Sequence, residues 1–129
     1  MFRTGVVTQF EAAHRLRGDF GPATRVHGHT YRVEISVSGP SLKDDGTLCD
    51  IGMLQKIVDD VVTPLHYRDL DALEAFQGQN TTAERLAIYL HESLAPRLET
   101  AALASLAVQV WESPQAFASY EDALRPSSS

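Results

Sequence analysis

Three histidines stand in a spacing that suits a metal ion. His27 and His29 are one residue apart, and His14 ends the upstream segment Phe10-Glu11-Ala12-Ala13-His14. Because side chains alternate along a strand, the His-x-His step places both imidazoles on one face. A third histidine on a neighbouring strand completes three nitrogen ligands, and three protein ligands with an open fourth position are typical of catalytic zinc. The alternative is that these are unrelated surface or core histidines, because a His-x-His step alone is a weak motif.

A second candidate functional residue is Glu112, at the end of a strand predicted over residues 106–112. Its parity is that of Leu106, Val108 and Val110, so its carboxylate falls on the apolar side of the strand, where a charge is costly unless it is paired. Such a carboxylate can accept two N–H groups from a heterocycle with an amidine-like edge, as guanine-like rings have. The alternative is that the strand has already emerged into solvent at residue 112.

The strands expected to position these residues belong to a small α+β domain with helices on one side of the sheet. Strands are predicted over residues 5–10, 27–37 and 106–112, with short extra strands. In the second, alternation places the two histidines at one end of an apolar face that continues through Tyr31, Val33, Ile35 and Val37.

Two helices are predicted between the second and third strands. The first has apolar residues at helical spacing from Met53 to Val62 and ends at Pro64. The second follows a capping box with Thr81 as N-cap and Glu84 at the third helical position, and it ends at Pro96. His91 is expected to be a solvated residue of this helix.

Length and composition predict one globular domain over residues 1–122 and a flexible tail over 123–129. The chain has 129 residues, 43% of them hydrophobic, and a net charge of −6, which argues against nucleic-acid and anionic-membrane binding. No segment approaches the ~20 apolar residues of a membrane helix, and the start of the chain does not resemble a signal peptide. The single cysteine, Cys49, excludes an intrachain disulfide, favours the cytoplasm and is expected to be a small core residue.

Five motifs, in this order, resemble the 6-pyruvoyl-tetrahydropterin synthase / 6-carboxy-tetrahydropterin synthase family, over about residues 4 to 120. The most specific part is Ala12-Ala13-His14 followed by His27-Gly28-His29 at this separation. The others are Asp50-Ile51-Gly52, Asn80-Thr81-Thr82-Ala83-Glu84 and Glu112-Ser113-Pro114.

The resemblance implies a T-fold: an antiparallel sheet with two helices on one face, assembled into a homo-oligomeric barrel (a hexamer or tetramer) with sites at subunit boundaries. It implies zinc on His14, His27 and His29. It also implies a substrate like dihydroneopterin triphosphate, with its pterin ring anchored by Glu112 and helped by Thr81 and Thr82. A helix cap alone would equally explain Thr81.

The chain departs from the family pattern at the proton-transfer groups. The usual catalytic cysteine, four residues before His-Gly-His, is replaced by Ala23, and the usual Asp-His pair becomes His66 and Tyr67. The metal ligands and the ring anchor are kept, whereas all three of these groups are changed.

Three explanations follow from this departure. In the first, His66 is the base, Asp69 or Asp71 orients it, and Asp19 or Tyr67 is the acid, which gives a zinc-dependent lyase with His66, Tyr67 and Asp69 as catalytic residues. In the second, the reaction has changed to an aldol-type cleavage of the pterin side chain.

In the third explanation the protein binds pterin without catalysis, and residues 66–71 are a polar surface loop. Nearby arginines are expected to contact substrate phosphate, or else are ordinary loop residues; they are Arg15, Arg17 and Arg25.

Overall fold

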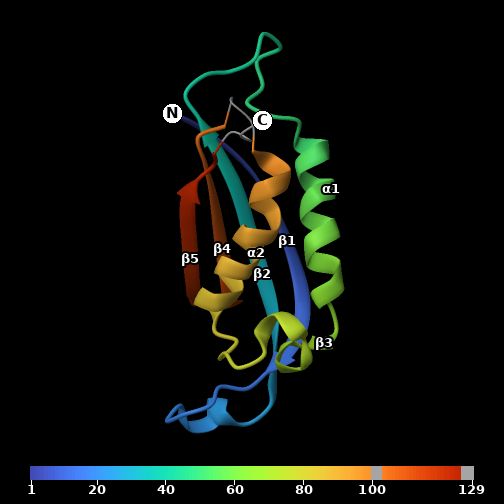
Figure 1. Cartoon of the computed structure of the whole chain (residues 1–129), viewed down its shortest axis with the longest axis vertical. Coiled ribbons are helices and arrows are strands. Elements are labelled where there is room, and N and C mark those ends of the chain that lie inside the picture. Colours follow the sequence, from blue (N-terminus) through green and yellow to red (C-terminus); the bar gives the residue numbers. More distant parts are fainter. Residues whose placement is uncertain (100–102, 126–129) are drawn as a thin grey trace.

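The computed structural model describes residues 1–99 and 103–125. They form a five-stranded sheet with two helices packed on one face, in the strand order β3-β1-β2-β4-β5 (Figure 1). The strands are β1 (Phe2–His14), β2 (His27–Gly39), β3 (Arg68–Asp69), β4 (Ser105–Ser113) and β5 (Ala116–Ala123). The helices are α1 (Ile51–Val62) and α2 (Ala83–Leu98). The predicted α+β class is confirmed.

The long antiparallel pair β1–β2 forms the centre of the sheet and sets the position of the histidines. Its register runs without interruption from Phe2 opposite Gly39 to His14 opposite His27. The alternation predicted for β2 is confirmed, because Tyr31, Val33, Ile35 and Val37 are buried beneath the helices. The histidines therefore lie at one end of the core-facing side of both strands.

Both helices cover this apolar face. The Asp50 side chain caps α1 by accepting from the N–H of Met53 at 3.2 Å, and the helix ends just before Pro64, as predicted. Pro96 does not end α2, because it lies inside the last turn and the helix continues to Leu98. The buried residues of the two helices include Leu54, Ile57, Val58, Val62, Leu86, Leu90, Leu94 and Leu98.

Two further predictions about α2 are wrong, in addition to its end at Pro96. The N-cap is Thr82, whose hydroxyl accepts from the N–H of Arg85 at 3.1 Å, and not Thr81. His91 is buried rather than solvated, with Nε2 3.1 Å from the main-chain oxygen of Leu106 and its ring edge-on to Tyr120. A helix lying across both β4 and β5 buries a wide stripe, and His91 falls within it.

The sheet is mixed rather than purely antiparallel, because β3 pairs parallel to β1 at Ala12 and Ala13. β5 extends through Ala123 and Leu124 is buried, so the folded part of the chain extends beyond the predicted boundary at residue 122. The rest of the predicted tail, residues 126–129, lies outside the described residues. Within the described ranges, neither helix is long and apolar enough to cross a bilayer.

Candidate metal and pterin site

The structure brings the three predicted histidines together at one end of the β1–β2 pair. One ligand atom from each of His14, His27 and His29 lies within 4.8 Å of the others. The imidazole centroids are 4.6 Å (His14–His27), 5.0 Å (His14–His29) and 4.8 Å (His27–His29) apart. The register explains this convergence, because His14 is opposite His27 while His29 is the next residue of β2 on the same face.

Hydrogen bonds on the outer side of two rings leave Nε2 directed to the centre of the cluster. Nδ1 of His14 lies 2.8 Å from the main-chain oxygen of Thr81, and Nδ1 of His27 lies 2.7 Å from that of Arg25. A carbonyl only accepts, so both Nδ1 atoms carry the proton and both Nε2 atoms keep a lone pair. Nε2 of His14 and of His29 is buried without a hydrogen-bond partner among the described residues. This donor set fits a zinc ion with one position left open.

Glu112 lies at the edge of the same cluster. Trp111, opposite Arg32, is the last residue of β4 paired with β2, and Glu112 follows it at a β-bulge, close enough for its charge to act on Tyr31 and His29. Burial lowers the pKa of His29, and the Glu112 carboxylate opposes that shift by favouring the charged imidazole. Glu112 is half-buried. A carboxylate therefore stands next to the metal cluster, where it can accept hydrogen bonds from a ligand.

Tyr31 lies next to the cluster. The sequence alone predicts no function for its hydroxyl group. Its ring is fully buried, stacks on Phe10 and meets His14 and His29 edge-on. The hydroxyl has no hydrogen-bond partner in the described part of the chain. Burial, together with the charges of Glu112 and Asp71, raises the pKa of Tyr31 far above its usual range, so the phenol stays protonated.

Tyr31→Phe is expected to stabilise the metal-free protein. The substitution removes a buried hydroxyl without a partner and keeps the ring stack, so the free energy of unfolding should rise by about 1 kcal/mol. Urea denaturation of both forms measures the change. A loss of about 1 kcal/mol would instead mean that the hydroxyl is hydrogen-bonded.

Thr81 and Thr82 lie between the cluster and α2. Thr81 is fully buried, and its hydroxyl donates to Asp71 Oδ1 at 3.0 Å and lies 3.1 Å from His14 Nδ1. Thr82 is half-buried; its hydroxyl accepts from the N–H of Arg85 and keeps its own proton to donate. Of the two, Thr82 has the free donor that a ligand could use.

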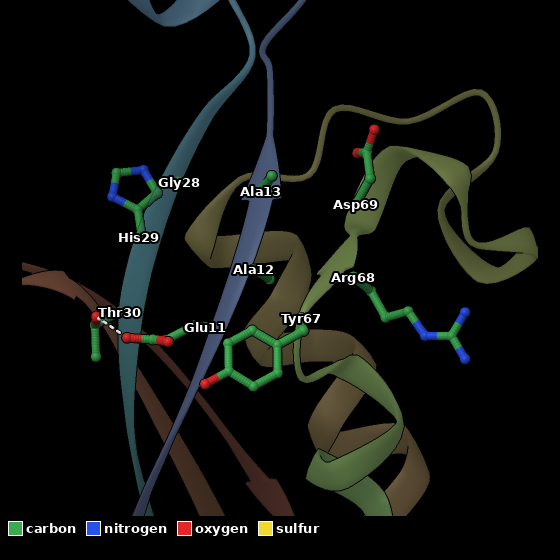
Figure 2. Close-up of a pocket in the computed structure, with 9 residues that line it drawn as sticks. All are labelled: Glu11, Ala12, Ala13, Gly28, His29, Thr30, Tyr67, Arg68 and Asp69. Carbon is green, nitrogen blue, oxygen red and sulfur yellow. Dashed lines mark hydrogen bonds between the residues drawn. The ribbon is translucent and has the colours of Figure 1, made fainter.

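The residues predicted to transfer protons lie apart from the metal cluster. Tyr67 and Asp69 border a cavity of about 490 Å³ with Glu11, Ala13 and other residues (Figure 2). Because Glu11 and Ala13 alternate with Ala12 and His14 along β1, this cavity opens mainly on the sheet face opposite the metal cluster. His29 borders it too, but Figure 2 shows its ring directed away from Tyr67.

The expected orientation of His66 by an aspartate is wrong. Nδ1 of His66 accepts from the main-chain N–H of Glu11 at 3.0 Å, so its neutral ring carries the proton at Nε2 and offers a donor. The carboxylate of Asp69 accepts from the N–H of Asp71, and that of Asp71 accepts from Thr81 and from the N–H of Arg15.

Tyr67 follows His66 in a left-handed conformation, with a φ of 60°, and is 76% exposed. The N–H of Tyr67 donates to the oxygen of Glu11 at 2.6 Å, so the main chain of Glu11 holds both residues. Positive φ is unfavourable for a tyrosine, and such strain is often found at functional sites.

The remaining candidates are less closely tied to the site. Ala23 lies in a short 3-10 turn, Gly21–Thr24, and Asp19 and the three arginines at 15, 17 and 25 are exposed. Cys49 is buried, as predicted, and burial raises the pKa of its thiol. Cys49 lines a hollow with Phe2 and Arg3, at the end of β1 far from His14, so its thiol lies away from the histidine cluster.

Comparison with known proteins agrees with this site. The 6-pyruvoyl tetrahydropterin synthase family matches residues 4–123. A 6-pyruvoyl tetrahydrobiopterin synthase of Dictyostelium discoideum is 30% identical over 114 residues, covering 77% of this chain and 84% of that protein. A dihydroneopterin monophosphate aldolase of Pyrococcus furiosus is 33% identical over 89 residues, covering 69% of this chain and 71% of that protein.

Comparison of the fold with solved structures points to the same family. The structure of Caenorhabditis elegans 6-pyruvoyl tetrahydropterin synthase superimposes with a TM-score of 0.82 at 26% identity, covering 94% of this chain and 95% of that one. The family match covers nearly the whole chain and includes all three histidines and Glu112. The chain therefore belongs to the 6-pyruvoyl tetrahydropterin synthase family.

Proposed function

We propose that this protein is a zinc-dependent lyase that acts on a reduced pterin with a phosphorylated side chain, such as 7,8-dihydroneopterin triphosphate. The observation that carries the proposal is the convergence of three imidazoles beside a half-buried carboxylate. His14, His27 and His29 would hold the metal. Bound zinc would supply Lewis-acid polarisation of the substrate's side-chain oxygens.

We assign recognition of the pterin ring to Glu112. Its carboxylate would accept two N–H groups from the ring, and its place beside His29 would set the pterin side chain toward the metal ligands. Thr82 would contact the ring through its free hydroxyl proton, whereas Thr81, whose hydroxyl is engaged with Asp71, would support the ring site from behind. Exposed Arg15, Arg17 and Arg25 would contact phosphate.

Proton transfer would use His66, Tyr67 and Asp69. His66 Nε2–H and the Tyr67 phenol are donors as placed, and the Asp69 carboxylate is the acceptor among the three. Since Tyr67 and Asp69 border the cavity on the other side of the sheet from the metal cluster of the same chain, their role requires a site shared with a neighbouring copy of the chain. The support for this arrangement is the exposure of Tyr67 at a strained position.

A homo-oligomer, hexamer or tetramer, is part of this proposal. Among the described residues, β5 pairs only with β4, and β1 pairs on its outer side only at Ala12 and Ala13, so both sheet edges have open hydrogen-bonding groups. Light scattering on the purified protein tests it, and a monomer would contradict the shared site. We place the protein in the cytoplasm.

Aldol-type cleavage of the pterin side chain is the second candidate function. The relative named as an aldolase favours it, and so does Ala23, which leaves no thiol at the position usual for the synthases. This cleavage needs a base at a side-chain hydroxyl and an acid that protonates the carbon left on the ring. The Asp69 carboxylate could be that base, and the His66 Nε2–H or the Tyr67 phenol could be that acid.

Mass spectrometry of the products distinguishes these functions. The zinc-loaded protein is incubated separately with dihydroneopterin triphosphate, dihydroneopterin monophosphate and dihydroneopterin. Release of triphosphate supports the phosphate-eliminating lyase, and release of a two-carbon aldehyde or its phosphate supports the aldolase. Tight binding without turnover of any substrate would contradict both and leave a pterin-binding protein.

His66→Ala is expected to lower kcat with either reaction. Loss of one general acid–base group should slow turnover by about 100-fold or more, with little effect on zinc content, because His66 is not part of the metal cluster. Steady-state kinetics on the active substrate measures it. An unchanged kcat would remove His66 from the catalytic residues.

A further inference from the structure

Asp71 is tied to a metal ligand by a buried chain of hydrogen bonds. Its Oδ1 accepts from the Thr81 hydroxyl at 3.0 Å, and that hydroxyl oxygen lies 3.1 Å from Nδ1 of His14. His14 and Thr81 are 1% and 0% exposed. Asp71 is half-buried in the connection between β3 and α2.

Asp71, at the end of this series of hydrogen bonds, determines the direction in which the Thr81 hydroxyl donates. A carboxylate only accepts, so the single proton of the Thr81 hydroxyl points to Asp71 and a lone pair faces His14. Nδ1 of His14 then meets two acceptors, the hydroxyl oxygen and the main-chain oxygen of Thr81. The proton is held on Nδ1, and Nε2 is kept free for a metal. The main-chain oxygen alone already holds this proton on Nδ1, so Asp71 does not choose the tautomer; without Asp71 the hydroxyl could turn its proton toward Nδ1–H, and the second contact that orients the ring would be lost.

The other oxygen of Asp71 acts on the same ligand through the main chain. Oδ2 accepts from the N–H of Arg15, the residue after His14, at 2.8 Å. Asp71 is itself fixed, because its N–H donates to Asp69 Oδ1 at 3.0 Å and its main-chain oxygen accepts from Gln77 at 2.9 Å. One carboxylate therefore restrains both the ring and the backbone of His14.

We infer that Asp71 is a positioning residue that, through Thr81 and the main chain of Arg15, sets the orientation and metal affinity of His14. This inference rests on the proposed metal site. Partners that orient ligating histidines commonly change metal affinity by about 10- to 100-fold when removed. The negative charge of Asp71 would also make the His14 ring a stronger electron donor to a bound metal cation.

Asn80→Ala is a matched control, because it loosens the same loop without removing the contacts of Asp71. Asn80 fastens the same connection to Arg17, accepting from its N–H at 2.8 Å and donating to its oxygen at 2.9 Å. Asn80→Ala breaks two loop hydrogen bonds close to the site without touching the chain from Asp71 to His14.

The test is zinc affinity of the full chain, measured by competition with a chromophoric chelator. Asp71→Ala and Thr81→Val should each weaken zinc binding by about 10- to 100-fold, Thr81→Ser should restore the affinity, and Asn80→Ala should change it by less than threefold. Nitrogen-15 NMR of the metal-free protein provides a second readout: the Nδ1–H of His14 should exchange faster with solvent in Asp71→Ala, where one of its two acceptors is lost, and at the wild-type rate in Asn80→Ala.

The outcomes separate the inference from the proposed function. Wild-type zinc affinity in Asp71→Ala, or an equal loss in Asn80→Ala, would overturn the role of Asp71 and leave the metal site standing. If Asp71→Ala fails to fold, Thr81→Val and Thr81→Ser decide the question in the same way. A wild-type protein that binds no zinc would overturn the metal site itself.

Discussion

His29→Ala should abolish stoichiometric zinc binding. Four ligands of a structural zinc site together supply about 10–16 kcal/mol, so one imidazole is worth about 3 kcal/mol and its loss weakens binding by a factor on the order of 100 or more. His29 is a suitable position because its ring is half-buried and its Nε2 has no hydrogen-bond partner among the described residues. Turnover should fall to background with it.

Zinc content after dialysis against a weak chelator measures this effect. His66→Ala is the matched control, because it also removes an imidazole but lies outside the cluster, and it should keep one zinc per chain. Equal zinc content in wild type and His29→Ala would contradict the assignment of His29 as a ligand.

Glu112→Gln should weaken pterin binding by roughly 100-fold while zinc content stays at one per chain. The amide keeps one acceptor but turns an NH₂ group toward a ring N–H, so one charge-assisted hydrogen bond is lost and two donors face each other. Such a change costs about 3 kcal/mol.

Fluorescence titration with dihydroneopterin measures the affinity. Glu34→Gln is the matched control, since Glu34 lies on β2 on the opposite sheet face and pairs with Arg32 at 2.8 Å. Pterin affinity that is the same in Glu112→Gln and in wild type would place the ring elsewhere.

The histidine cluster could be predicted from the sequence because strand periodicity is a short-range property. Parity along β2 fixes His27 and His29 on the face of Tyr31 and Val33, and the same rule gives the face of Val108 and Val110 in β4, which leads up to Glu112. What parity does not provide is the pairing register, and the structure supplies it by placing His14 opposite His27.

The cap of α2 was predicted one residue early because two adjacent threonines satisfy the same local rule. Either hydroxyl can cap the helix, and the choice is made by a distant contact: Asp71 and His14 engage Thr81, which leaves Thr82 to cap α2. The role of Asp71 could not be found for the same reason.

The position of His91 could have been found from the sequence. His91 lies on the same helical stripe as Ala87, Leu94 and Leu98, all of which are buried. The prediction of a solvated residue relied on the polarity of histidine instead of on this spacing. The orientation of His66 could not have been predicted in this way, because it depends on the backbone of Glu11, a partner 55 residues away along the chain. No local pattern reports such a contact.

A crystal of the zinc-loaded protein, measured at the zinc absorption edge, tests the central claim most directly. The anomalous map should show one peak per chain between Nε2 of His14, His27 and His29, at about 2.0–2.1 Å from each nitrogen. A peak bound by other residues, or three rings that point apart around no peak, would contradict the account.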